Sequence, residues 1–184
     1  MDKDRRLFLV LDTETTGFSA VNDEILEVAF VLTDFVEMYA VLSTYVRPQA
    51  PFITNQHNGI TPEMVRHAPP FDDIAAGAYA LLALADTHCA YQASFDLRFL
   101  REALARCGYR LPLREVYDPL RRLPHKQRLR EACAQRNIKC DDIEWHSALG
   151  DCVATYRLTR AMLESDGRSA ADAMREEVTF GLRF

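Results

Sequence analysis

The stretch LFLVLDTETTGF, residues 7–18, constrains the fold more than any other part of the chain. Five apolar residues lead directly to Asp12 and Glu14. A continuous apolar run is typical of a strand buried on both faces of a sheet. Side chains two apart on a strand project from the same face, so the two carboxylates converge at the strand end. Two like charges there are unfavourable unless a cation lies between them; a solvated turn is the alternative interpretation.

The remaining pattern predicts an α/β fold with a mixed sheet covered by helices. The pattern predicts two strands, over 24–34 and 37–48, that form a hairpin. Two shorter strands are predicted over 87–93 and 114–120, among helices over 61–68, 71–86, 94–108, 126–138 and 146–165. Thr61 and Ser94 are the expected N-caps, and Gly108 is expected to end the helix that Ser94 begins.

The length of 184 residues fits one domain, which we expect to span 1–165, with a C-terminal tail over 166–184. No apolar run reaches eighteen residues, and the N-terminus lacks a signal-peptide pattern, so we expect a cytoplasmic protein without a membrane partner. The five cysteines show no C-x-x-C spacing, which argues against a zinc ribbon and a disulfide framework.

The net charge of −5 argues at first against a polyanionic partner. Residues 98–139, however, hold twelve Lys and Arg against four Asp and Glu. This basic stretch is either a solvated helical face or a surface that contacts phosphates. The candidates for phosphate contacts are Arg98, Arg101, Arg121, Arg122, Lys126, Arg128 and Arg130.

Two further acids stand at element boundaries of the same chain. Asp96 falls in the first turn of the helix over 94–108, where the helix dipole alone could explain a carboxylate. Asp151 falls in the helix over 146–165, on or near the face that the apolar residues Leu149, Val153 and Leu158 are expected to bury. A buried acid needs a partner. His146 lies five positions before Asp151, about one and a half helical turns, so both side chains can reach one site.

Three motifs, LDTETTG, YQASFDLRFL and HSALGD, resemble the exonuclease motifs of the DEDDh, or DnaQ-like, 3'-5' exonucleases. This family includes the epsilon proofreading subunit of bacterial replicative polymerase and ribonuclease T. The resemblance extends from Leu7 to about Leu163, and NGIT at 58–61 matches a G-I-T-like loop of the family. It implies a ribonuclease H-like fold, with a mixed five-stranded sheet flanked by helices, and two bound divalent metal ions, Mg²⁺ or Mn²⁺.

The resemblance also implies a role for each acid. By motif position, the metal ligands are Asp12, Glu14, Asp96 and Asp151, and His146 is the general base. Two metals about 3.5–4 Å apart can activate a water and hold the leaving oxygen of a phosphodiester. A histidine, whose ordinary pKa is about 6.5, can accept the proton of that water at neutral pH.

The expected substrate is the 3' end of single-stranded DNA or RNA, because a single strand needs no unpairing. Phe18 is either a residue that stacks on the terminal bases or an ordinary core phenylalanine. Tyr91 and Gln92 replace the His-Asn pair that is usual in the second motif of the family. The full set of expected substrate contacts is Thr15, Thr16, Gly17, Phe18, Asn58, Gln92 and Phe95.

The sequence leaves the protein partner open: it is either a polymerase or a second copy of the chain. The tail has apolar residues at alternate positions, which suits an added strand, a docking peptide or a frayed end; they are Val178, Phe180, Leu182 and Phe184. Gly150 either permits a close approach of backbone or substrate or is simply tolerated near a helix start. A catalytically silent nucleic-acid or partner-binding module, and a metal-dependent phosphatase or endonuclease, are the competing functions.

Overall fold

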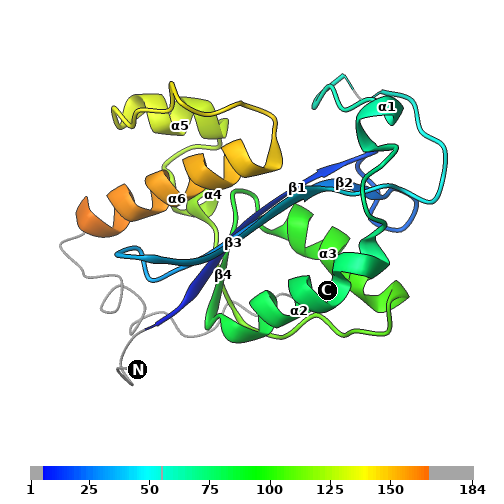
Figure 1. The fold of residues 1–184 in the computed structure, drawn as a ribbon. Coiled ribbons are helices and arrows are strands. Elements are labelled where there is room, and N and C mark those ends of the chain that lie inside the picture. Colours follow the sequence, from blue (N-terminus) through cyan, green and yellow to red (C-terminus); the bar gives the residue numbers. More distant parts are fainter. Residues whose placement is uncertain (1–5, 55, 166–184) are drawn as a thin grey trace.

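A mixed five-stranded sheet organises the computed structural model, which describes residues 6–54 and 56–165 (Figure 1). The order of the strands is β3-β2-β1-β4-β5. β2 is antiparallel to β1 and β3, whereas β4 and β5 run parallel to β1. The bounds are Phe8–Thr15 for β1, Ile25–Thr33 for β2, Met38–Tyr45 for β3, Thr87–Cys89 for β4 and Glu115–Tyr117 for β5. The predicted sheet is therefore confirmed.

Helices cover both faces of this sheet, as Figure 1 shows. α2 and α3 pack on one face, and α6, with α4 and α5 beside it, packs on the other. The bounds are Pro62–Val65 for α1, Phe71–Leu84 for α2, Ser94–Arg106 for α3, Pro119–Arg122 for α4, Leu129–Gln135 for α5 and Ala148–Ser165 for α6.

The alternation of side chains along β1 sets which layer each residue meets. Leu9 and Leu11 belong to the core cluster shared with α2 and α3. Phe8 and Val10 belong to the cluster shared with α6. Because the side-chain period of a strand is two, Asp12 and Glu14 continue the row that faces α6.

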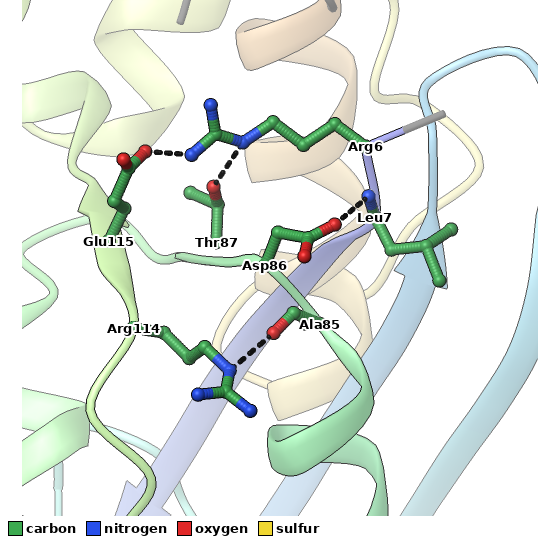
Figure 2. Close-up of polar contacts among 7 residues, drawn as sticks. All are labelled: Arg6, Leu7, Ala85, Asp86, Thr87, Arg114 and Glu115. Carbon is green, nitrogen blue, oxygen red and sulfur yellow. Dashed lines mark hydrogen bonds and ion pairs between the residues drawn. The ribbon is translucent and has the colours of Figure 1, made fainter. Parts of the chain in front are cut away.

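Polar contacts join the N-terminal ends of the three parallel strands β1, β4 and β5, away from the acidic motifs (Figure 2). Arg6, just before β1, donates to Glu115 of β5 and, through Nε, to the hydroxyl of Thr87 in β4 at 3.2 Å. The backbone N–H of Leu7 donates to Asp86 Oδ2 at 2.9 Å. These contacts align the N-terminal ends of β1, β4 and β5, so the three strands run towards the same edge of the sheet, where the acidic motifs lie.

Two of the three expected helix boundaries are confirmed and one is wrong. Thr61 caps α1 by accepting from the N–H of Met64, and Gly108, with φ of 80°, follows the end of α3. Ser94, however, is the first residue of α3 and not its N-cap; the N-cap is Ala93, without a side-chain hydrogen bond. The carboxylate of Asp118, which follows β5, accepts from the backbone of this turn instead. A residue remote in sequence therefore replaces the local cap.

One expected core position is also wrong. Leu149 of α6 is exposed, whereas Leu158 is buried as expected and Val153 is partly buried. Ala148 and Cys152 face the sheet in its place, because small side chains let α6 lie close to β1.

The predicted tail over 166–184, with its alternating apolar residues, lies outside the described residues, and so does the test of the 1–165 boundary. Among the helices of the described part, none combines the length and the apolar character needed to cross a membrane.

Candidate active site

Asp12, Glu14 and Asp151 meet where the end of β1 faces the start of α6. One carboxylate oxygen from each lies within 4.8 Å of the others. All three residues are half-buried. β1 contributes two of them through its two-residue period, and α6 brings the third across the sheet face. The convergence that the sequence predicted for Asp12 and Glu14 is thus present, and Asp151 joins them.

Asp96 approaches from the other side of β1. It lies in the first turn of α3 and is 3% exposed. Its Oδ1 accepts from the backbone N–H of Thr13 at 3.0 Å and from the Thr13 hydroxyl at 2.8 Å. Asp96 is not one of the three acids within 4.8 Å, but its charge acts on Asp12. All four predicted metal ligands therefore belong to one electrostatic cluster.

Burial raises the pKa of each acid in this cluster, and repulsion from neighbouring carboxylates adds to the rise at Asp12 and Glu14. Burial raises the pKa of Asp12 well above its ordinary value, and the charges of Asp96, Asp151 and Glu14 add to the effect. Burial raises the pKa of Glu14 to about 8 and that of Asp96 to about 7, against hydrogen bonds that favour the ionised forms. Burial also raises the pKa of Asp151. The cluster therefore has a high affinity for positive charge, either protons or a cation.

The cluster fits a divalent metal on the chemistry of its donors. Asp151 Oδ1 is buried and accepts no hydrogen bond from the described residues. A buried carboxylate oxygen without a donor is unfavourable unless a cation coordinates it. Hard ions such as Mg²⁺ prefer carboxylate oxygens. The acidic group can therefore hold a metal.

His146 lies in the segment that leads into α6. Its side chain is exposed, and its backbone adopts a φ of 65°, a left-handed conformation that is uncommon for residues other than glycine. Ser147 Oγ donates to the carbonyl of Glu144 at 2.8 Å and accepts from the N–H of Gly150 at 3.1 Å. These bonds tie the turn that carries His146 to the first turn of α6.

Gly150 is required by this turn. A Cβ at Gly150 would overlap the carbonyl oxygen of Glu144 and lie 2.9 Å from Ser147 Oγ. Of the two interpretations left open by the sequence, the close backbone approach is therefore the one that the fold bears out.

Glu27 is a fifth acid at the site and is not among the residues predicted from the sequence. It lies on β2 directly opposite Glu14 and is 7% exposed. Its Oε2 accepts from the backbone N–H of Ala148, the first residue of α6, at 3.0 Å. The available signal was a charged residue in the middle of the strand ILEVAFVLT, which is buried at every position.

Three aromatic side chains, Phe18, His57 and Phe95, lie together, and Phe95 directly precedes Asp96. The side chain of Phe18 is 69% exposed, which excludes a core role. Its ring centroid lies 5.4 Å from that of His57 and 6.4 Å from that of Phe95, both in edge-to-face geometry. Asn58 hydrogen-bonds to the carboxylate of Glu14. His57 was not among the predicted contacts, although it precedes the NGIT motif.

The threonines and glycine after Glu14 build the loop that carries Phe18. Thr15 Oγ1 donates to the carbonyl of Gly17 at 2.6 Å, and Thr16 Oγ1 donates to Asp23 Oδ1 at 3.1 Å. Asn58 Nδ2 donates to the carbonyl of Thr15 at 3.1 Å. The Thr15 side chain is buried, so its hydrogen bond stabilises the loop from inside, whereas the exposed Phe18 side chain projects from the loop.

The residues that depart from the second motif have separate roles. The hydroxyl of Tyr91 donates to the carbonyl of Gln127 at 2.7 Å. This bond fixes the basic segment after α4 to the turn before α3. Gln92 is exposed, with a φ of 65°, and its backbone N–H donates to Asp118 Oδ1 at 3.0 Å.

Six of the seven basic candidates are exposed, and Arg101 is half-buried in an ion pair with Glu102. Arg122 lies over the ring of Tyr117, and Arg130 lies over the ring of Trp145. The exposed residues are Arg98, Arg121, Arg122, Lys126, Arg128 and Arg130.

Residues 9–159 match the RNase_T family, which is described as exonuclease. The chain is 35% identical over 121 residues to the 3'-5' exonuclease DinG of Bacillus subtilis (strain 168), which covers 64% of this chain and 13% of that protein. It is 30% identical over 171 residues to the PolC-type DNA polymerase III of Oceanobacillus iheyensis, which covers 86% of this chain and 12% of that protein. The chain thus spans only about an eighth of the length of these relatives.

Two solved structures share the fold. E. coli exonuclease I in complex with a dA16 oligonucleotide superposes with a TM-score of 0.75 at 20% identity, over 90% of this chain and 42% of that one. Exonuclease X in complex with 5' overhanging duplex DNA superposes with a TM-score of 0.69 at 25% identity, over 90% and 96%. The expected ribonuclease H-like fold of exonucleases is confirmed.

Proposed function

The chain belongs to the RNase_T, or DnaQ-like, family of exonucleases, and from this premise we propose that it removes nucleotides from the 3' ends of single-stranded DNA or RNA. The observation that carries the proposal is the meeting of three carboxylates from β1 and α6 within 4.8 Å, with one buried Asp151 oxygen that accepts no hydrogen bond from the described residues.

Asp12, Glu14, Asp96 and Asp151 would hold two divalent ions, Mg²⁺ or Mn²⁺. When bound, such ions supply the positive charge that a phosphodiester needs before an anionic nucleophile can approach it, and they lower the pKa of a bound water. The carboxylates differ in what they offer. Asp96 already accepts two hydrogen bonds from Thr13 at one oxygen, whereas the Asp151 oxygen is uncommitted among the described residues.

His146 would accept the proton of the attacking water on an imidazole nitrogen. It is exposed at the entrance to α6, five positions before Asp151, so it can approach a substrate beside the acids without occupying their space. The bonds of Ser147 to Glu144 and Gly150 restrict the turn, which would lower the entropic cost of orienting the imidazole.

Phe18, Phe95 and His57 would form the platform for the terminal bases. An exposed phenylalanine in edge contact with two other rings offers a rigid apolar surface, and stacking of a base on an aromatic side chain contributes about 1–3 kcal/mol. Asn58 and Gln92 would add polar contacts to the terminal nucleotide. The exposed arginines and lysine near α4 and α5 would follow the phosphates of the incoming strand.

The resemblance to PolC-type polymerases supports a polymerase as a partner of this chain, so that the domain would act on a primer end. The dA16 complex of exonuclease I and the single strand that it contains support a single-stranded substrate.

The test uses one single-stranded DNA and one RNA oligonucleotide, each labelled at the 5' end, with Mg²⁺ or Mn²⁺ and with EDTA. We expect a ladder that shortens from the 3' end and disappears in EDTA. His146→Asn should also abolish it, since Asn tolerates a positive φ and keeps the turn intact. His67→Ala, at an exposed histidine after α1, is the matched control and should cleave like the wild type.

Binding of both strands without cleavage under any of these conditions would contradict the proposal and favour a silent binding module. Internal fragments in place of a stepwise ladder would instead indicate an endonuclease.

A further inference from the structure

The buried Glu27 carboxylate is the feature that the proposed chemistry leaves unused. We propose that Glu27 is a positioning residue, which fixes the start of α6 to the sheet and thereby aligns His146 and Asp151 with the acids of β1. This inference rests on the proposed function. It assigns Glu27 no contact with substrate or metal.

The position of Glu27 is electrostatically unfavourable, so a specific interaction must offset it. The residue faces Glu14 across the β1–β2 pair and is 7% exposed. Burial raises its pKa, and the charges of Glu144 and Asp151 add to this rise. An uncompensated buried carboxylate in such a place would be strongly destabilising.

The offsetting interaction is the hydrogen bond from the N–H of Ala148 to Glu27 Oε2, 3.0 Å long. Ala148 is the first residue of an 18-residue helix, whose first N–H groups have no partner within the helix. A carboxylate at this end satisfies one of these groups and interacts favourably with the helix dipole. The bond joins residues 121 positions apart, from a central strand to the helix start.

The helix start carries both groups that it would position. Ala148 lies two residues after His146 and three before Asp151. The turn is internally rigid, because Ser147 bonds to Glu144 and Gly150 and because Gly150 admits no side chain. A rigid turn transmits the position of Ala148 to its neighbours, and Glu27 sets that position relative to the strand next to β1.

The experiment compares Glu27→Met, which keeps the volume and removes the acceptor, with Glu27→Gln, whose amide oxygen still accepts from Ala148. Glu24→Met is the matched control. Glu24 also accepts two backbone N–H bonds, from Gln49 and Ala50, but these do not involve α6. Two quantities are measured: kcat and KM on a 5'-labelled oligonucleotide with Mg²⁺, and the amide exchange rate of Ala148 without metal.

We expect Glu27→Met to lower kcat by about 10- to 100-fold, the effect of a misplaced catalytic group, while KM changes less than about threefold. The amide of Ala148 should exchange faster in the same variant. Glu27→Gln should restore both quantities towards those of the wild type, and Glu24→Met should leave both unchanged.

A Glu27→Met protein with the wild-type kcat and exchange rate would overturn the positioning role. Equal losses of kcat in Glu27→Gln and Glu27→Met would also overturn it, since the charge and not the acceptor would then matter. If Glu27→Met does not fold, Glu27→Gln still tests the proposal, because a loss of kcat in this variant with the wild-type exchange rate of Ala148 would overturn it. An inactive wild-type protein would refute the proposed function, whereas the exchange of Ala148 tests the helix anchor independently of activity.

Discussion

In Gly150→Ala, a gain in helix propensity competes with a clash against the backbone of the preceding turn. Gly150 is the third residue of α6, where alanine would ordinarily stabilise a helix. The added Cβ, however, would overlap the carbonyl oxygen of Glu144 and crowd Ser147 Oγ at 2.9 Å. Glu144 contributes backbone and not a flexible side-chain end, so the turn that carries His146 must move away from the helix.

The magnitude follows from three contributions. Helix propensity favours alanine over glycine by about 1 kcal/mol. Overpacking costs about 1–3 kcal/mol, and more where backbone must shift. Loss of the Gly150 N–H bond to Ser147 Oγ costs about 1 kcal/mol. The net effect is a loss of about 1–3 kcal/mol in the free energy of unfolding, and each kcal/mol lowers the melting temperature by about 2–4 °C.

The assay pairs denaturant unfolding in EDTA with turnover in Mg²⁺. We expect turnover to fall at least about tenfold, because His146 moves with the turn. Gly77→Ala is the matched control: Gly77 lies within α2, and its added Cβ would meet only Leu42 Cδ1, at 3.8 Å. That variant should gain up to about 1 kcal/mol with unchanged turnover. A Gly150→Ala protein that behaves like Gly77→Ala would refute the reasoning.

Three further outcomes are expected. Asp12→Asn should abolish hydrolysis yet raise the melting temperature in EDTA, because it removes a buried charge from a repelling cluster; retained cleavage would contradict the metal role. Burial raises the pKa of Glu14 to about 8 and of Asp96 to about 7, so these groups hold protons in the folded state that the unfolded state releases above about pH 4–5. The contribution of this cluster to the free energy of unfolding in EDTA should therefore be highest at and below about pH 4 and fall as the pH rises to about 8. Mg²⁺ should reverse the fall, and melting curves of Glu14→Gln should show a weaker pH dependence. Phe18→Ala should weaken single-strand affinity by about 1–3 kcal/mol in a fluorescence titration, whereas Val21→Ala, at an exposed apolar residue of the same loop, should not.

Much of the local structure could be predicted from the sequence, because its causes are local. The apolar run of β1 and its two-residue period place Asp12 and Glu14 on one face, and the fold confirms that arrangement. The cap of Thr61 and the turn at Gly108 depend on neighbouring residues only.

The errors arose where tertiary packing overrode a local preference. Ser94 has the side chain of an N-cap, but Asp118 accepts the backbone N–H groups before α3, so the helix begins at Ser94 itself. Leu149 has an apolar side chain in a helix, yet the small Ala148 and Cys152 occupy the face against β1. Local preference carries no information on which competing partner lies nearby.

The strand that ends in two carboxylates, the order of the three motifs and the residues available to bind a metal can all be read from the sequence. Three features become visible only in the folded chain: Asp151 reaches the acids of β1, Glu27 accepts from Ala148, and Gly150 must lack a side chain. The first two depend on the register of β1 against β2 and on how closely α6 packs on the sheet. The third depends on how the turn at Glu144 folds back on the start of α6. Contacts between residues more than a hundred positions apart are set by the packing of whole elements, which no short stretch of sequence specifies.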